Sequence, residues 1–249
     1  HTLWPVAHLA NELARRWSVP WVGVVHGHDF DVGLDLKGVG EKVRSMAAAC
    51  NALVCATDRL GDIASALDPP PKRTTIIPCV TDVHKEWRRP VSPMKKTWKK
   101  EPIDILFPAD PRRPEKRHLL ALQTGEALEQ RGWMVGVTSL RHQPRDIVFD
   151  RMLTADVTLI TSKREAGPLV ARESLLCGTP VVSVDVGEVK RYLPSDWVCG
   201  EDPEALADGI EAALRTGWTE ATSVEERLAF ASKAEVSQAW RELLASLVS

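Results

Sequence analysis

The chain has 249 residues, of which 44% are hydrophobic and 27% charged, and its formal net charge is −2. This composition is that of an ordinary globular protein, which excludes collagen-like, low-complexity and disordered chains. No stretch of about 18 apolar residues occurs, so the sequence predicts no membrane-spanning helix. The balanced charge argues against a dedicated nucleic-acid-binding protein, and we expect no nucleic-acid partner.

In the first part of the chain, segments typical of helices alternate with short apolar segments typical of strands. A helix is expected from Leu3 to Trp17, because apolar residues recur there at helical spacing. Strands are expected at residues 21–25, 52–55 and 74–77, and helices at 42–49 and 58–67. Thr57 suits the N-cap of the last of these helices. This alternation predicts parallel βαβ units.

The composition changes between His84 and Glu101. Seven basic and two acidic residues lie there with Trp87 and Trp98, without clear periodicity. We interpret this segment as a linker between two domains. A second interpretation is that its basic residues and tryptophans contact an anionic membrane.

The alternation restarts after Glu101. Strands are expected at residues 103–107, 134–137, 157–160, 180–184 and 197–199, and helices at 115–131, 145–154, 168–177, 202–214 and 223–247. Pro168 suits the first position of its helix, and Gly178 the position just after the same helix. The pattern predicts a complete doubly wound domain, with its ligand crevice at the carboxyl ends of the strands.

Several familiar site types are not indicated. The five cysteines are an odd number without a C-x-x-C pair, which argues for reduced thiols rather than a disulfide framework or a zinc knuckle. We find no metal-ligand pattern and no P-loop. Gly38-Val39-Gly40 lacks the third glycine of a dinucleotide fingerprint, and no strand leads into it.

The first segment that can carry chemistry runs from Glu165 to Glu173, between an expected strand and the next helix. Gly167 allows a ligand to approach the backbone closely, and the amides of the first helical turn favour an anion such as phosphate. Carboxylates placed here suit sugar hydroxyls. The alternative is two solvated glutamates.

A second segment, from Asp110 to Arg117, precedes the helix expected from Glu115. Four cations at a helix N-terminus oppose the helix dipole, which makes sense if a phosphate binds there. The alternative is a solvated basic loop.

The third segment, His26-Gly27-His28-Asp29, follows the strand expected at residues 21–25. His26 can therefore reach a crevice between two domains. The alternative is a hydrogen-bonded structural histidine.

Together these segments resemble the retaining family 4 glycosyltransferases. The stretch from Leu159 to Val182 closely resembles the family's E-x7-E region. The family's glycine turn is similar to Val184-Asp185-Val186-Gly187-Glu188. Its phosphate-binding loop is similar to Pro114-Glu115-Lys116, and its H-G-x-D element is similar to Val25-His26-Gly27-His28-Asp29. Enzymes of bacterial surface-polysaccharide synthesis, of the teichuronic-acid type, are expected to be the nearest relatives.

The resemblance implies an α/β fold of the GT-B type, with two Rossmann-like domains, parallel sheets and a cleft between the domains. Residues 1–83 would form an acceptor-side domain, residues 84–101 a basic linker and residues 102–249 the nucleotide-sugar-binding domain, with the last helix packing back on the first domain. Family members have further strands before the region that matches His1, so the first domain is expected to be incomplete in this chain.

The resemblance also implies a cytoplasmic, metal-independent, retaining hexosyltransferase without a cofactor. It would move a sugar from a UDP- or GDP-sugar to a saccharide, lipid-linked or small-molecule acceptor, with peripheral membrane contact as a further expectation. The residues implied as catalytic are His26, Lys116 and Glu165. Those implied to bind the donor are Arg112, Arg113, Lys116, Glu165, Ala166, Gly167, Pro168, Leu169 and Glu173.

Within that set, the resemblance gives each group a role. Glu165 would hold the donor sugar hydroxyls, Glu173 the nucleotide ribose and Lys116 the diphosphate, with His26 near the reacting carbon. Pro111 stands where the family has an arginine, and Cys79 where it has an asparagine. A non-catalytic module that only binds nucleotide-sugars is therefore the second hypothesis.

Overall fold

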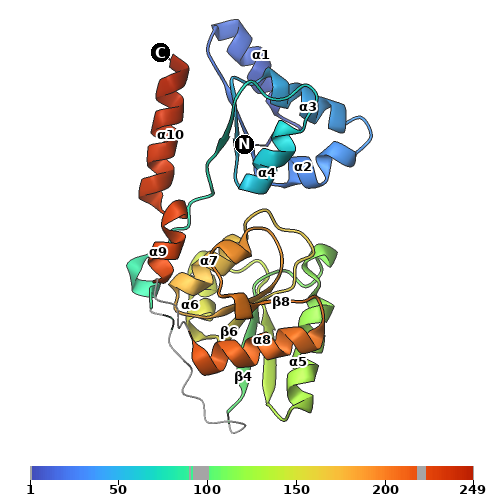
Figure 1. The fold of residues 1–249 in the computed structure, drawn as a ribbon, viewed down its shortest axis with the longest axis vertical. Coiled ribbons are helices and arrows are strands. Elements are labelled where there is room, and N and C mark those ends of the chain that lie inside the picture. Colours follow the sequence, from blue (N-terminus) through green and yellow to red (C-terminus); the bar gives the residue numbers. More distant parts are fainter. Residues whose placement is uncertain (1, 90, 92–100, 218–222, 249) are drawn as a thin grey trace. The chain divides into compact units, whose positions relative to one another are not determined.

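The computed structural model describes residues 2–89, 91, 101–217 and 223–248. Its contacts divide the chain into unit 1, His1–Val80 with Phe230–Ser249, and unit 2, Thr81–Ala229. Each unit is built on a parallel sheet (Figure 1). Among the described residues, no helix combines the length and the apolar composition needed to cross a membrane.

The described part of unit 1 contains a three-stranded parallel sheet in the order β1-β2-β3, formed by Val22–Val25, Ala52–Cys55 and Thr74–Ile76. All four residues of the central strand β2 are apolar and buried, as expected of a strand covered on both faces. The helices are α1 (Ala7–Trp17), α2 (His28–Asp31), α3 (Gly40–Ala49) and α4 (Asp58–Ser65). Thr57 caps α4 as predicted, because its side chain accepts a hydrogen bond from the Leu60 amide at 3.4 Å.

The C-terminal helix α10 (Lys233–Val248) also belongs to unit 1. Its Val236 and Leu243 are buried in one core with residues from all three strands or their ends, namely Val24, Ala52, Val54 and Ile77. Arg73 donates a hydrogen bond to the Ser246 hydroxyl at 2.6 Å. The end of the chain therefore completes the core built by its beginning.

Helix α1 buries a different face from the one its apolar spacing indicates. Val6, Leu9 and Trp17 are exposed, Trp17 by 64%, whereas Ala7 and Ala14 are buried. Since α1 contacts α3, the small alanine side chains bring the two helices close together. Periodicity predicted the helix, which begins at Ala7 rather than at Leu3, but not the face that packs.

The described part of unit 2 contains a five-stranded parallel sheet in the order β5-β4-β6-β7-β8. The strands β4 to β8 are Ile103–Phe107, Val135–Ser139, Val157–Ile160, Val181–Val184 and Val198–Cys199. The helices α5 to α9 are His118–Gln130, Arg145–Thr154, Leu169–Leu176, Pro203–Thr216 and Val224–Leu228. Because β5 and β6 lie on opposite sides of β4, the strand order reverses there, and ligands of such sheets bind at that point.

Part of the expected linker is packed against unit 2. The Trp87 indole donates a hydrogen bond to Asp150 at 3.0 Å, and its ring lies 5.1 Å from that of Phe149 in α6. The backbone of Arg89 donates to the Leu176 carbonyl at 3.1 Å. Residues 90 and 92–100, which include Trp98 and four of the five lysines of the expected linker, lie outside the described residues.

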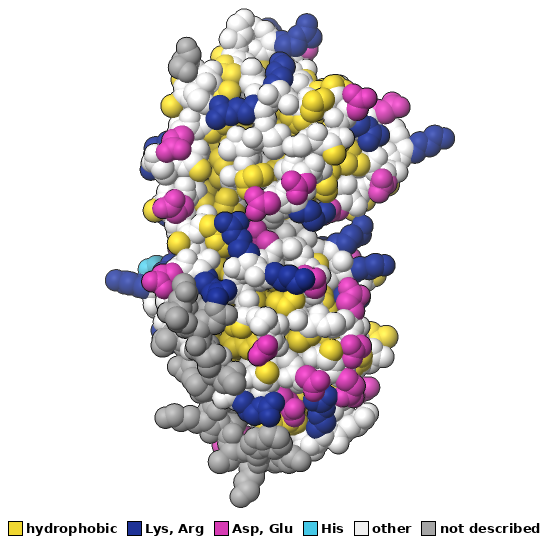
Figure 2. Space-filling model, in the orientation of Figure 1, with side chains coloured by type: hydrophobic (Ala, Val, Ile, Leu, Met, Phe, Trp, Pro, Cys, Tyr) yellow, Lys and Arg dark blue, Asp and Glu magenta, His cyan; other side chains and the backbone are white. Residues whose placement is uncertain are grey.

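Charged side chains of both signs are interspersed over the face of the molecule shown in Figure 2. This distribution agrees with the formal net charge of only −2. On the face shown, side chains of neither sign gather into one broad charged field.

Candidate functional site

The candidate site lies at the carboxyl ends of β4 and β6, where the strand order reverses. Two loops that follow these strands are tied together by hydrogen bonds. The amide of Lys163 donates to the Glu115 carbonyl at 2.8 Å, and the Thr161 hydroxyl donates to the carbonyls of Lys116 and Arg117 at 2.7 and 3.1 Å. These bonds place the loop of residues 114–117 beside the loop of residues 161–168.

Arg117 explains why the helix expected from Glu115 begins later. Its backbone is in the left-handed region, at φ 53° and ψ 52°, so α5 starts only at His118 after a separate 3-10 turn at Pro114–Lys116. Its guanidinium bonds to the Thr161 carbonyl and to Glu201, each at 2.5 Å. The structure therefore uses this cation to hold the loops.

Lys116 and Glu165 form an ion pair between the two loops. Their side chains are only 16% and 17% exposed, so the pair lies in a partly desolvated position. An ammonium group carries three N–H donors, and the bond to Glu165 takes one of them. The pair thus joins two residues that the resemblance assigns to the donor site, and the bond to Glu165 leaves two of the three N–H donors of Lys116 to other acceptors.

Arg112 and Arg113 are matched by neighbouring carboxylates instead. Arg112 pairs with Asp110 at 2.7 Å and Arg113 with Glu115 at 2.6 Å, with the arginine side chains 61% and 58% exposed. Hydrogen bonds from Arg112 hold the pKa of the Asp110 carboxyl well below its usual range. Each cation of this segment thus has a carboxylate partner in the structure, while the phosphate that the opposition to the helix dipole predicted stays a prediction.

Glu173 is buried on α7 and faces a cation that the sequence analysis missed. Both of its carboxylate oxygens bond to Arg145 at the start of α6, one of them at 3.2 Å. The Arg145 guanidinium also lies 4.6 Å from the ring centre of Phe149. A cation at the first position of a helix opposes the dipole, which was the one available sequence signal.

The loop before α7 is supported from the turn that follows β7. Pro168 is the N-cap and α7 begins at Leu169, one residue later than predicted. Gly187 has φ +60°, and a Cβ there would lie 2.7 Å from the Ala166 carbonyl oxygen and 3.1 Å from that of Glu165. Only glycine therefore fits this turn against the loop that carries Glu165.

In unit 1, His26 follows β1 and its Nδ1 lies 3.3 Å from the Cys79 sulfur. Partial desolvation of the ring lowers the pKa of His26, and the Asp29 carboxylate opposes this shift. The ring is accordingly neutral near pH 7 and can accept the thiol hydrogen bond.

Asp29, in the same H-G-x-D element, is buried and organises the neighbouring chain. It accepts hydrogen bonds from the amides of Leu3 and Trp4 at 2.9 and 3.0 Å. Trp4 in turn lies under the Lys42 ammonium, 4.5 Å from the ring centre. A cavity of about 620 Å³ opens there, lined by Leu3, Trp4, His8, Glu41, Lys42, Ser45 and Met46.

The described residues contain no cluster of three or more His, Cys, Asp or Glu side chains suited to a metal ion. All five cysteines are free thiols, in line with the odd count and spacing. Burial raises the pKa of the Cys177 thiol to about 12, so this side chain acts as a small apolar group.

Residues 124–235 match the family Glycosyl transferases group 1. The D-inositol 3-phosphate glycosyltransferase of Xylanimonas cellulosilytica is 34% identical over 126 residues, a match that covers 45% of this chain and 30% of that protein. The chain thus spans about a third of the length of this curated relative.

Two solved structures share the fold. Sucrose-phosphate synthase from Thermosynechococcus elongatus has a TM-score of 0.67 at 19% identity, over 98% of this chain and 73% of its own. HepE from Anabaena, in complex with UDP, has a TM-score of 0.71 at 17% identity, over 97% of this chain and 76% of its own. The expected GT-B type of α/β fold is confirmed.

Proposed function

We propose that this chain is a metal-independent, retaining glycosyltransferase of the teichuronic-acid-type branch of family 4, which takes its sugar from a UDP- or GDP-sugar. The observation that carries the proposal is the Lys116–Glu165 ion pair at the strand-order reversal of unit 2. It joins a cation suited to a diphosphate with a carboxylate suited to sugar hydroxyls. HepE, a structural neighbour, has been solved with UDP-glucose.

The donor would use groups that the structure holds on two loops and one helix. Lys116, with Arg112 or Arg113, would neutralise the diphosphate together with the amides from Ala166 to Leu169. Glu165 would accept hydrogen bonds from the sugar, and the buried Glu173 would accept them from the ribose. Each bond to a charged acceptor contributes about 1.5–3 kcal/mol.

The reaction we propose breaks the bond between the anomeric carbon and the diphosphate oxygen. Negative charge then develops on the leaving diphosphate, where the fixed Lys116 ammonium stabilises it. The acceptor hydroxyl attacks from the same face, and its proton passes to the departing phosphate oxygen. His26, neutral near pH 7, would lie near the reacting carbon in this scheme.

The acceptor we propose is a hydroxyl of a saccharide, a lipid-linked sugar or a small molecule. Support for the small-molecule case comes from the relative named for D-inositol 3-phosphate. Peripheral contact with an anionic membrane at its cytoplasmic face is the further part of this proposal. The Trp87 indole N–H already donates to Asp150, so in this proposal the basic residues of the linker segment provide the attraction to the membrane.

A nucleotide-sugar panel tests the proposal. Titration calorimetry with UDP, GDP and their glucose, mannose and N-acetylglucosamine conjugates should give saturable binding to the wild-type chain, unaltered by EDTA. Incubation with acceptor extracts should then release nucleoside diphosphate and give a product that keeps the donor's anomeric configuration by NMR. Binding without transfer would favour the module that only holds the donor, and no binding at all would overturn both.

A further inference from the structure

Arg172 lies inside the segment between the two glutamates, yet its surroundings differ from theirs. Its side chain is 1% exposed, which makes it one of the largest fully buried side chains in the described part of the chain. A guanidinium is always charged in proteins, so burying it requires a compensating charge. The partner that provides it shows what this arginine does.

That partner is Glu188 in the turn after β7. An Arg172 guanidinium nitrogen lies 3.5 Å from a Glu188 carboxylate oxygen, and the Glu188 side chain is only 11% exposed. Glu188 directly follows Gly187, whose Cα faces the carbonyls of Glu165 and Ala166. The ion pair therefore fixes the turn that supports the Glu165 loop.

Tyr192 completes this buried cluster. Its side chain is fully buried, and its hydroxyl makes no hydrogen bond within the described residues. Burial is the largest cause that raises the pKa of Tyr192, the Glu188 and Glu165 carboxylates add to the rise, and Arg172 opposes it. The charges of the ion pair and of Glu165 thus act on the same phenol, behind the loop rather than on its open side.

We propose that Arg172 and Glu188 are positioning residues, whose buried ion pair holds the turn of residues 185–188 against the Glu165 and Ala166 carbonyls and so fixes Glu165 toward a donor sugar. This inference rests on the proposed donor site. Neither residue touches the donor. Removing one member of a buried pair leaves the other charge buried without compensation, so each of these side chains holds the other in place.

Binding of two ligands to the Arg172→Met variant separates positioning from general damage. UDP lacks the sugar, so its affinity should stay within about twofold of wild type, whereas the extra affinity of UDP-glucose over UDP should fall by about tenfold or more. Arg172→Lys keeps the charge and should restore most of that gain. Arg151→Met, at an exposed arginine of α6, is the matched control and should change neither affinity.

Hydrogen exchange on the unliganded chain provides a readout that needs no donor. Arg172→Met and Glu188→Gln should each speed amide exchange by about fivefold or more at residues 161–168 and 185–189, while the core strand β4 stays protected. If Arg172→Met does not fold, Glu188→Gln carries the same comparison, with Arg172→Lys as the variant that keeps the charge.

The outcomes separate the two proposals. If the wild-type chain binds neither UDP nor UDP-glucose, the proposed function fails, and exchange alone decides whether the pair positions the loop. Unchanged exchange at both segments would overturn the positioning role. Equal losses of UDP and UDP-glucose affinity would overturn it as well.

Discussion

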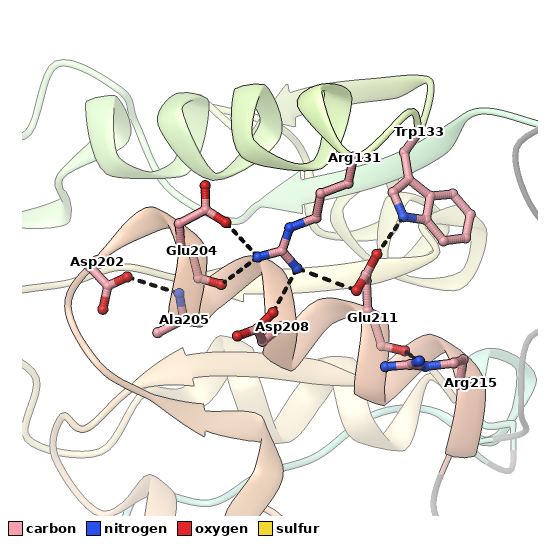
Figure 3. A network of polar contacts seen from close by, with 8 residues as sticks. All are labelled: Arg131, Trp133, Asp202, Glu204, Ala205, Asp208, Glu211 and Arg215. Carbon is pink, nitrogen blue, oxygen red and sulfur yellow. Dashed lines mark hydrogen bonds and ion pairs between the residues drawn. The ribbon is translucent and has the colours of Figure 1, made fainter.

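Two sets of ion pairs in unit 2 use the same chemistry in different arrangements. In the first, Arg131 after the end of α5 bonds to three carboxylates of α8, with Glu204 at 2.5 Å, Asp208 at 2.6 Å and Glu211 at 3.3 Å (Figure 3). The Trp133 indole donates to Glu211 at 2.8 Å. One guanidinium is thus surrounded by acceptors, and it binds two helices together.

The second set consists of single pairs at the strand ends. Lys116 meets Glu165, and Arg145 meets the buried Glu173, each with one carboxylate to one cation. Each of these cations therefore meets one carboxylate, whereas Arg131 meets three. We infer from this comparison that a cation bonded to several carboxylates, such as Arg131, serves as an anchor. A cation bonded to one carboxylate can exchange that contact for a contact with a substrate.

The largest expected effect is the loss of UDP affinity when the Lys116–Glu165 pair of the second set is removed. Lys116→Met should weaken UDP binding by about 10- to 100-fold, the loss of one or two charge-assisted bonds of about 1.5–3 kcal/mol. Titration calorimetry measures the change, with Lys233→Met at an exposed position of α10 as the control. Unchanged UDP affinity in Lys116→Met would remove this pair from the donor site.

The next largest effect is expected at Gly187, in the turn that supports the Glu165 loop. Gly187→Ala should lower the free energy of unfolding by about 1–3 kcal/mol, because its positive φ is strained for alanine and the new Cβ meets backbone carbonyls. Gly38→Ala is the matched control, since Gly38 has φ +75° and a Cβ added there would meet only open space. Urea denaturation compares the two. Equal losses would mean that contact with the Glu165 loop contributes nothing.

Removing the Arg131 guanidinium, which holds α5 and α8 together, should lower the stability of the chain and leave its UDP affinity unchanged. Arg131→Met should lower the free energy of unfolding by about 1–2 kcal/mol, a modest value because two of its three carboxylates are well exposed and screened. Urea denaturation gives the stability and calorimetry the UDP affinity. A large loss of UDP affinity in this variant would contradict the distinction between the two sets.

The cap of α8 should have a smaller effect. The Asp202 side chain accepts a hydrogen bond from the Ala205 amide at 2.9 Å, so Asp202→Ala should cost about 1 kcal/mol. Asp202→Asn keeps a capping oxygen and should retain most of the stability in the same urea experiment. Equal destabilisation by both would show that the carboxylate charge, rather than the cap bond, is responsible.

The smallest expected effect is a change in the pH dependence of stability, caused by His26 in unit 1. Because its folded pKa lies below the ordinary value of 6.5, the unfolded chain binds the proton more readily. This contribution to stability is fully present above pH 6.5 and is lost as the pH falls through the lowered folded value. His26→Gln should therefore flatten the acid side of the stability profile slightly, as urea denaturation at a series of pH values would measure.

The sequence predicted contiguous features well. The strands at residues 52–55, 103–107 and 157–160 and the helix at residues 145–154 have the expected bounds, because apolar runs and caps are local signals. The GT-B fold followed from motifs at the strand ends.

What sequence reasoning missed depends on contacts between distant segments. The Arg145–Glu173 pair joins residues 28 positions apart, and the exposed apolar face of α1 follows from how closely it packs on α3. The left-handed backbone of Arg117 depends on carbonyls contributed by another loop. No local pattern contains these contacts.

The most direct test of the account is the affinity difference between UDP-glucose and UDP, measured by calorimetry on the wild-type chain and on Glu165→Gln. If Glu165 holds the donor sugar, the wild type should bind UDP-glucose more tightly than UDP, and Glu165→Gln should lose most of that difference while keeping its UDP affinity. An unchanged difference in Glu165→Gln would contradict the account.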